Sequence, residues 1–108
     1  MKTQNEVQLI GYLGQDPMIS TAANGSKRAY LRLATDRYRK LEDGSAWKQT
    51  TWHDIVVWDK KASKVENDFI KGSHVLVEGQ IEHRRYFKNN ERRFITQIRA
   101  TKVMNLDR

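Results

Sequence analysis

Trp52 and Trp58, six positions apart, carry the most specific chemistry in this sequence. An indole is a flat apolar platform that stacks on another ring or on a cation. If residues 50–58 form a strand, both tryptophans share one face with Asp54, because side chains alternate between the two faces. An aspartate is almost never fully buried without a partner, so we expect this face to meet solvent and a ligand. The alternative is ordinary core, the default for a tryptophan in a β-rich domain.

The spacing of the two tryptophans indicates which ligand they would stack on. Six residues of strand span roughly 20 Å at about 3.3 Å per residue, so each indole would be a separate platform. Duplex DNA offers its base faces to no side chain, whereas unstacked single strands do, and such stacking has little sequence preference. We therefore expect sequence-tolerant binding of single-stranded nucleic acid. The opposite, inward face of the strand would hold His53, Ile55 and Val57.

Positive charge is concentrated in two stretches of the chain. The 108 residues include 20 lysines and arginines against 13 aspartates and glutamates, a formal charge of +7. Residues 27–48 contribute +4 and residues 82–102 contribute +5, which leaves −2 for the rest of the chain. Regional positive charge is typical of a surface that binds a polyanion. A basic solvated surface without a partner is the alternative.

Both basic stretches contain aromatic side chains. Alternation places Arg84, Tyr86 and Lys88 on one face and predicts that Phe87, on the other, packs inward. Phosphates need positive charge, and unstacked bases need a flat apolar partner. The expected stacking residues are Trp52, Trp58, Tyr86, Tyr38 and Trp47, and the expected phosphate contacts are Arg32, Arg37, Arg39, Lys48, Arg84, Lys88 and Arg93.

The remaining chemistry-bearing residues form no catalytic or metal-binding pattern. His53, His74 and His83 have no short ligand spacing, and no carboxylate pair is placed for acid–base work. The sequence has no cysteine and no glycine loop for phosphates. We expect no enzyme, no metal and no cofactor, and we interpret His53 as a hydrogen-bonded structural histidine. Apolar runs are too short to span a bilayer, so we expect a soluble, unexported protein without a membrane partner.

The first half of the chain alternates apolar and polar residues in the manner of three strands. Residues 7–13 are the first of them. Residues 27–35 follow the turn signal Asn24-Gly25 as the second, and about 50–58 is the third. Residues 36–49 are polar and basic, which predicts a long hairpin loop between the second and third strands.

The second half of the chain predicts one helix and two further strands. Residues 59–70 space their apolar side chains at helical intervals, with Asp59 as a candidate cap at the start. A fourth strand runs over about 75–81, where Gly79 indicates a bend or bulge. A fifth strand covers residues 93–104. Its expected apolar side consists of Phe94, Ile98, Ala100 and Met104.

Three strands, one helix and two strands is the element order of an OB-fold, a five-stranded Greek-key barrel. The order predicts an all-β fold with its single helix between strands 3 and 4 and with long hairpin loops. Because 108 residues suit one core, we expect residues 1–108 to form a single domain that binds single-stranded DNA.

Short motifs run in order along almost the whole chain. They are Asn5-Glu6-Val7, Leu9-Ile10-Gly11-Tyr12-Leu13-Gly14-Gln15-Asp16-Pro17, Leu33-Ala34-Thr35, Thr51-Trp52-His53, Lys71-Gly72-Ser73 and Val77-Glu78-Gly79-Gln80-Ile81. Together they resemble the bacterial single-stranded DNA-binding protein (SSB) family. Each motif alone is weak, and the resemblance is specific because it extends over the chain.

The resemblance implies an OB-fold, usually assembled as a homotetramer, that coats and protects single-stranded DNA in replication, recombination and repair. Such a protein works in the cytoplasm, at the nucleoid. The resemblance also implies DNA-stacking roles for Trp52, Trp58 and Tyr86, with Tyr38 close to another stacking position. Lys60 matches a basic position just beyond Trp58, and we expect it to contact phosphate.

The chain departs from this family in two respects. Relatives often carry a basic residue where this chain has Asp54, so we expect slight repulsion of phosphate there. Relatives also commonly continue into a flexible linker and an acidic, phenylalanine-ended tip. This chain stops four residues after Met104, so we do not expect recruitment of repair enzymes through such a tip.

Two other functions are compatible with the sequence. One is an OB-fold interaction module of a replication-restart or recombination complex, in which DNA binding is secondary. The other is an RNA-binding OB domain, because no residue identifies a reader of the 2′-hydroxyl.

Overall fold

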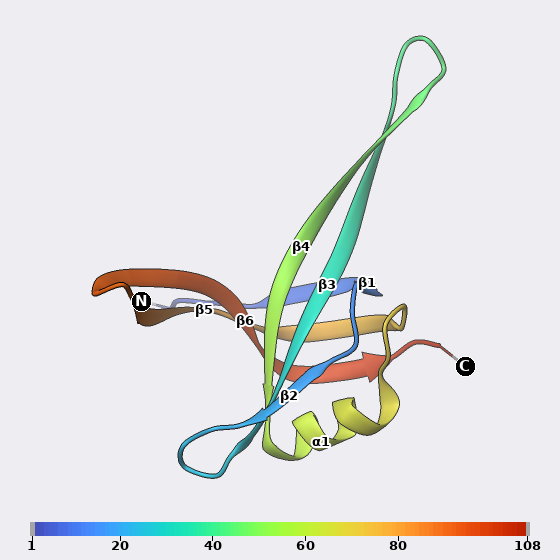
Figure 1. Ribbon diagram of the computed structural model, residues 1–108. Coiled ribbons are helices and arrows are strands. Elements are labelled where there is room, and N and C mark those ends of the chain that lie inside the picture. Colours follow the sequence, from blue (N-terminus) through green and yellow to red (C-terminus); the bar gives the residue numbers. More distant parts are fainter. Residues whose placement is uncertain (1, 108) are drawn as a thin grey trace.

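The computed structural model describes residues 2–107, which form one sheet of six strands and one helix (Figure 1). The elements are β1 (Val7–Leu13), β2 (Met18–Thr21), β3 (Lys27–Lys40), β4 (Ala46–Trp58), α1 (Asp59–Asp68), β5 (His74–Lys88) and β6 (Glu91–Asn105). Alternation of apolar and polar residues therefore predicted five of the six strands. It missed the short β2, which follows Pro17.

Five strands close into a barrel. The strands pair in the order β1-β5-β6-β4-β3, and a further pairing of β1 with β3 closes the ring. The short β2 adds to the outer edge of β3 and is not part of that ring. The helix α1 lies between β4 and β5, the third and fourth strands of the barrel. The predicted five-stranded OB-fold is confirmed.

The barrel core is built from the inward side chains of all five strands and from one side of α1. Leu31, Leu33, Ile55 and Val57 are fully buried, as period-2 alternation predicts for β3 and β4. Ala62 and Val65 of α1 are also buried, and Phe69 follows them. The helix therefore covers one end of the barrel (Figure 1).

Two glycines allow the barrel to close. A Cβ on Gly11 would lie 2.1 Å from the carbonyl oxygen of Ala34, where β1 meets β3. A Cβ on Gly79 would lie 2.2 Å from the carbonyl oxygen of Arg99, where β5 meets β6. Because only glycine permits such close approach of two backbones, these positions bring the strands together.

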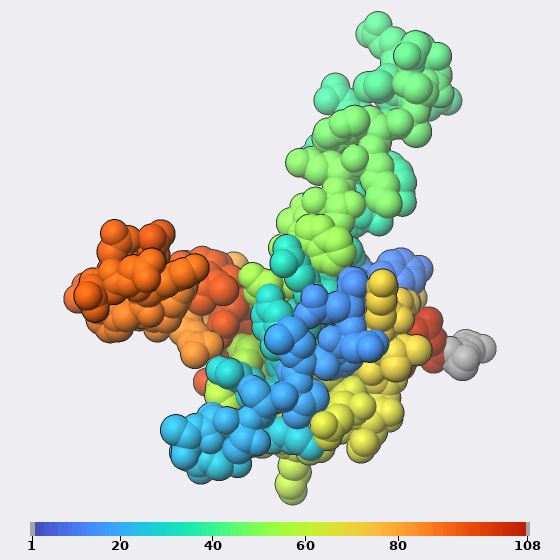
Figure 2. Space-filling view, in the orientation of Figure 1, coloured from blue at the N-terminus to red at the C-terminus, as the bar shows by residue number. Residues whose placement is uncertain are grey.

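Two long hairpins extend beyond the barrel as arms. The β3–β4 arm pairs continuously from Arg32 opposite Asp54 to Lys40 opposite Ala46. The β5–β6 arm pairs from Ile81 opposite Ile98 to Lys88 opposite Glu91. Figures 1 and 2 show them as separate projections in different directions. Residues 36–49, predicted as a loop, are therefore mostly a paired ribbon with a short turn at its tip.

The start of α1 differs from the prediction. Trp58 occupies the N-cap position and makes no capping hydrogen bond with its side chain. Asp59, predicted to be the cap, has a φ of 58°, so its backbone is in the left-handed region at the first helical residue. The prediction was wrong by one residue, because β4 continues up to the point where the helix begins.

Three predicted inward side chains are exposed. The register of β5 and β6 shifts at Glu78 and Gly79, and this bulge confirms the prediction for Gly79. The extra residue reverses the alternation in β6, so Val103 is buried and Met104 is 41% exposed. Phe94 and Phe87 are 61% and 74% exposed because they lie on the β5–β6 arm, beyond the barrel.

Among residues 2–107, no helix has the length and apolar character needed to cross a membrane.

We predict that Gly79→Ala destabilises the fold by about 1–3 kcal/mol, because the added methyl group would overlap the Arg99 carbonyl. The free energy of unfolding in urea measures the loss. Gln80→Ala, at the exposed neighbouring position, is the matched control and should change stability little. An unchanged midpoint for Gly79→Ala would contradict the close approach.

Candidate nucleic-acid interface

Trp52 stands on the outer side of β4 with its ring held from two directions. The side chain is 47% exposed. The guanidinium of Arg32 lies 5.3 Å from the ring centroid, within the range of a cation–π interaction. A Cβ on Gly14 would lie only 2.4 Å from Cζ3 of the indole, so the ring packs directly on that backbone. Trp52 is thus a positioned stacking platform beside a positive charge.

Trp58 repeats this arrangement at the other end of the same strand face. It is half-buried, and the Arg28 guanidinium lies 5.8 Å from its ring centroid. Lys60 and Arg99 line a depression beside it. Each tryptophan therefore has an arginine over its ring, and Trp58 has two further basic side chains nearby.

Asp54, between the tryptophans, is engaged within the protein. It accepts a hydrogen bond from the hydroxyl of Tyr30 and lies opposite Arg32 in the β3–β4 register. Burial, reinforced by this hydrogen bond and by the charge of Asp54, raises the pKa of Tyr30 to about 12. Tyr30 therefore stays neutral at ordinary pH and continues to donate its hydrogen bond to the carboxylate.

One position on this strand face is buried, contrary to the sequence prediction. Val56 is only 4% exposed. It forms part of a depression lined also by Met18 of β2, Tyr30 and Gln97. Sequence reasoning missed this because β2, which contributes Met18, was not predicted.

The outer side of the β5–β6 arm continues this surface. Ile55 and Ile98 are paired inward where β4 meets β6, so Gln97 and Arg99 point outward on the same side as Asp54. Gln97 donates a hydrogen bond of 2.7 Å to Glu82, its partner on β5. Farther along the arm, alternation puts a set of basic and aromatic residues on this side: Arg84, Tyr86, Lys88 and Arg93.

A groove links the two parts of this surface. Arg28, Val56, Arg84 and Gln97 line both of its adjoining depressions, and Trp58 lines one of them. Within the β5–β6 arm, Arg93 pairs with Glu91 at 2.8 Å, between exposed side chains. We call the continuous outer surface from Trp52 and Trp58 to Tyr86 the primary face.

The β3–β4 arm divides its predicted residues between two sides. Tyr38 and Lys48 lie opposite each other on the Trp52 side, and Lys48 is 3.9 Å from Asp36. Trp47 and Arg39 are paired on the other side. The primary face brings together most of the predicted residues: Arg32, Tyr38, Lys48, Trp52, Trp58, Lys60, Arg84, Tyr86, Lys88 and Arg93. It excludes Arg37, Arg39 and Trp47.

Sequence reasoning missed several residues of the primary face. Arg28 shares the strand parity of Arg32, an expected phosphate contact, so alternation could have identified it. Met18 had no such signal, since β2 is only four residues long. Gln97 and Arg99 required the pairing of β4 with β6, which no local pattern predicts.

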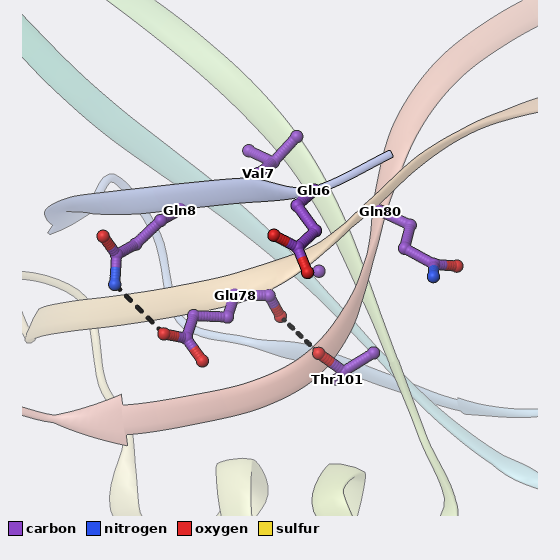
Figure 3. Close-up of a pocket in the computed structure, with 7 residues that line it drawn as sticks. Glu6, Val7, Gln8, Glu78, Gln80 and Thr101 are labelled. Carbon is purple, nitrogen blue, oxygen red and sulfur yellow. Dashed lines mark hydrogen bonds between the residues drawn. The ribbon is translucent and has the colours of Figure 1, made fainter. Parts of the chain in front are cut away.

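A different depression lies between β1 and β5 (Figure 3). Glu6 and Glu78 line it, and the amide of Gln8 donates a 3.0 Å hydrogen bond to Glu78. Thr101 donates to the backbone carbonyl of Glu78 at 3.2 Å. Two carboxylates disfavour a polyanion in this depression.

His53 lies on the inward side of β4 as a structural histidine. Its Nε2 is 2.9 Å from Oγ1 of Thr35, which confirms the predicted hydrogen bond. Burial lowers the pKa of His53 below its ordinary value of 6.5, although the nearby Asp54 acts in the opposite direction. Among residues 2–107, no group of three or more histidine, aspartate or glutamate side chains could hold a metal ion.

Comparison with known proteins adds to this geometry. A family model described as "Single-strand binding protein family" matches residues 4–106. The fold is similar to that of a Plasmodium falciparum SSB in complex with single-stranded DNA, with a TM-score of 0.84 and 28% identity over 99% of this chain and 98% of that one. It is also similar to a deletion mutant of the single-stranded DNA binding protein from Thermus aquaticus, with a TM-score of 0.81 and 27% identity. That match covers 96% of this chain and 51% of the other.

We predict that acidification destabilises the fold through His53. Because folding lowers its pKa, the contribution of neutral His53 is complete above pH 6.5 and is lost as the pH falls below that value. His53→Gln should therefore flatten the decline of the unfolding free energy between about pH 7 and pH 5. Urea unfolding across that range is the measurement. His83→Gln, at an exposed position, is the control and should retain the decline.

Proposed function

We propose that the chain, which belongs to the single-strand binding protein family, binds single-stranded DNA with little sequence preference and protects it. Proteins of this family are non-catalytic DNA-binding proteins, which confirms the prediction that the chain is not an enzyme. The solved Plasmodium falciparum complex supports single-stranded DNA as the ligand.

The observation that carries the proposal is the pairing of each exposed-face tryptophan with an arginine. Arg32 over Trp52 and Arg28 over Trp58 place positive charge beside two flat platforms on one strand. A single strand offers bases to the indoles and phosphates to the guanidinium groups. Because an indole stacks on any base, such contacts confer little sequence preference.

The other residues of the primary face extend this path in the proposed complex. Tyr38 and Tyr86 would stack on bases along the two arms, and Lys60 would contact phosphate beside Trp58. The proposed phosphate contacts of the primary face also include Arg32, Lys48, Arg84, Lys88 and Arg93.

We further propose that residues 1–108 act as a single DNA-binding domain at the nucleoid in the cytoplasm, in replication, recombination and repair. Membership of the family supports these roles. The alternatives are an interaction module of a replication-restart complex and an RNA-binding domain. Competition of poly-U against oligo-dT separates the RNA alternative, and a tight co-purifying protein with weak DNA binding would favour the interaction module.

Self-association, with a homotetramer as the proposed state, would use the outer side of β1, β5 and β6. Ile10, Leu76 and Met104 are neighbours across these three strands, and Tyr12 stacks on His74 with ring centroids 4.5 Å apart. Ile10, Tyr12 and Met104 are all exposed. Contiguous exposed apolar side chains are typical of a protein–protein interface. We call this surface the apolar outer face.

We predict that Trp52→Ala weakens binding to oligo-dT by about 1–3 kcal/mol, the usual value of one base stacked on an aromatic side chain. Fluorescence anisotropy of a labelled oligo-dT at low salt measures the affinity. The logarithm of the binding constant should decrease linearly with the logarithm of the salt concentration, with a slope of roughly 0.7 per phosphate contact. Wild-type binding that is absent, or insensitive to salt, would contradict the proposed function.

Two further variants separate stacking from folding. Trp52→Phe keeps an aromatic platform and should retain most of the affinity. Gly14→Ala leaves Trp52 in the sequence but introduces a methyl group within 2.4 Å of its ring, so it should displace the indole and weaken binding. Circular dichroism should show the same fold for all three variants.

We predict that Ile10→Glu dissociates the assembly, because a charge on the apolar outer face must be desolvated in an interface. Light scattering should report an oligomer for the wild type and a mass near 12.7 kDa for the variant. Ile70→Glu is the matched control, since Ile70 is an exposed isoleucine outside this face. An oligomer that survives Ile10→Glu would place the interface elsewhere.

A further inference from the structure

The two arms have a second side that the primary face does not use. Residues opposite each other on paired strands share a side, and successive residues alternate. On the β3–β4 arm this second side carries Arg37, Arg39 and Trp47. On the β5–β6 arm it carries Arg85, Phe87, Arg92 and Phe94. We call these residues together the second face.

Acidic side chains are divided unevenly between the two sides of the arms. Within the paired strands of the arms and their roots, all of which the structure describes, Asp36, Asp54, Glu82 and Glu91 lie on the primary side. The second face carries arginines and no acidic residue in these described strands. It is therefore the side of the arms where positive charge is not offset.

The aromatic side chains of the second face are exposed and adjoin arginines. Trp47 is 43% exposed and lies opposite Arg39. Phe87, the most exposed of them, lies opposite Arg92. The Arg85 guanidinium lies 5.9 Å from the ring centroid of Phe94. This repeats the arrangement of Arg32 over Trp52 on the primary face.

The second face and the primary face meet where the arms separate. The strands β4 and β6 are paired at two positions, Val56 with Arg99 and Ile55 with Ile98. Past the second of these pairs, toward the arms, the two strands diverge (Figure 1). A depression at this point is lined from the primary side by Trp52, Asp54 and Gln97, and from the second side by His53, Ile81 and Thr96. Residues of both sides of the arms therefore line one depression.

We propose that the second face binds a further segment of the same single strand of DNA, which leaves the primary face beside Trp52 at the depression between the arms. This inference rests on the proposed function. Four arginines on a side of the paired strands that carries no acidic residue suit phosphates, and three exposed rings suit unstacked bases. A second copy of the same face is a poor partner, because like charges would be brought together.

The test compares the two sides of the β5–β6 arm with a short and a long oligo-dT. One OB-fold covers about 4–16 nucleotides, so an oligomer of about 8 should occupy the primary face and one of about 30 should reach both faces. The second-face variant is Arg92→Gln, because Arg85 also lines the groove beside Trp58 on the primary face. The matched primary-face variant is Arg93→Gln, at the neighbouring position of the same strand. Each variant removes one charge.

The second-face variant should bind the short oligomer as the wild type does. With the long oligomer, the slope of the logarithm of its binding constant against the logarithm of the salt concentration should fall by roughly 0.7, for one lost phosphate contact. The primary-face variant should lose affinity for both lengths. Phe87→Ala should weaken only the long complex by about tenfold, whereas Tyr86→Ala should weaken both.

Three outcomes would overturn the proposal. One is a second-face variant that binds the long oligomer with the wild-type affinity and salt slope. Another is a second-face variant whose assembly mass in light scattering differs from that of the wild type while the salt dependence of its DNA binding is unchanged. That result would assign the face to a contact between copies of the chain. The third is saturable binding of a poly-glutamate peptide to this face without an effect on DNA. If the wild type fails to bind even the short oligomer, the proposed function fails as well.

Discussion

The close approach of backbones at Gly11 and Gly79 is the constraint on which the rest of the structure depends. Gly11 lies against the carbonyl of Ala34, and Ala34 is paired with Trp52. The contact that closes the barrel therefore also determines where β3 and β4 leave it and where the indole stands. Gly79 has the same role at the root of the β5–β6 arm, where the bulge in β6 sets which side chains point outward.

At the centre of the primary face, each aromatic ring and the carboxylate between them interact with a neighbouring side chain. The two indoles lie beneath arginines, and the carboxylate between them accepts a hydrogen bond from a tyrosine whose pKa is raised. Asp54, which is poorly suited to DNA in isolation, therefore holds Tyr30 in the floor of the groove. A surface of this kind combines positive charge with fixed aromatic platforms, the two requirements for holding a flexible single strand.

Sequence patterns predicted the strands, the helix and most of the primary face because these depend on short-range periodicity. The alternation in β4 put Trp52 and Trp58 on one side and Ile55 and Val57 in the core, as observed. The same reasoning was wrong for Phe87 and Phe94, since an arm beyond the barrel has no core to bury them. It also missed β2, whose four residues carry too little alternation to be recognised.

By itself, the sequence determined the regional charge, the alternation within each strand and the glycines that permit close contact. Only the tertiary structure decided which sides of separate strands form one surface. The pairing of β4 with β6 joins Trp58 to the β5–β6 arm, and the register of β3 with β4 separates Tyr38 from Trp47. The physical reason is that side-chain alternation is local, whereas register, bulges and barrel closure depend on hydrogen bonds between segments far apart in the chain.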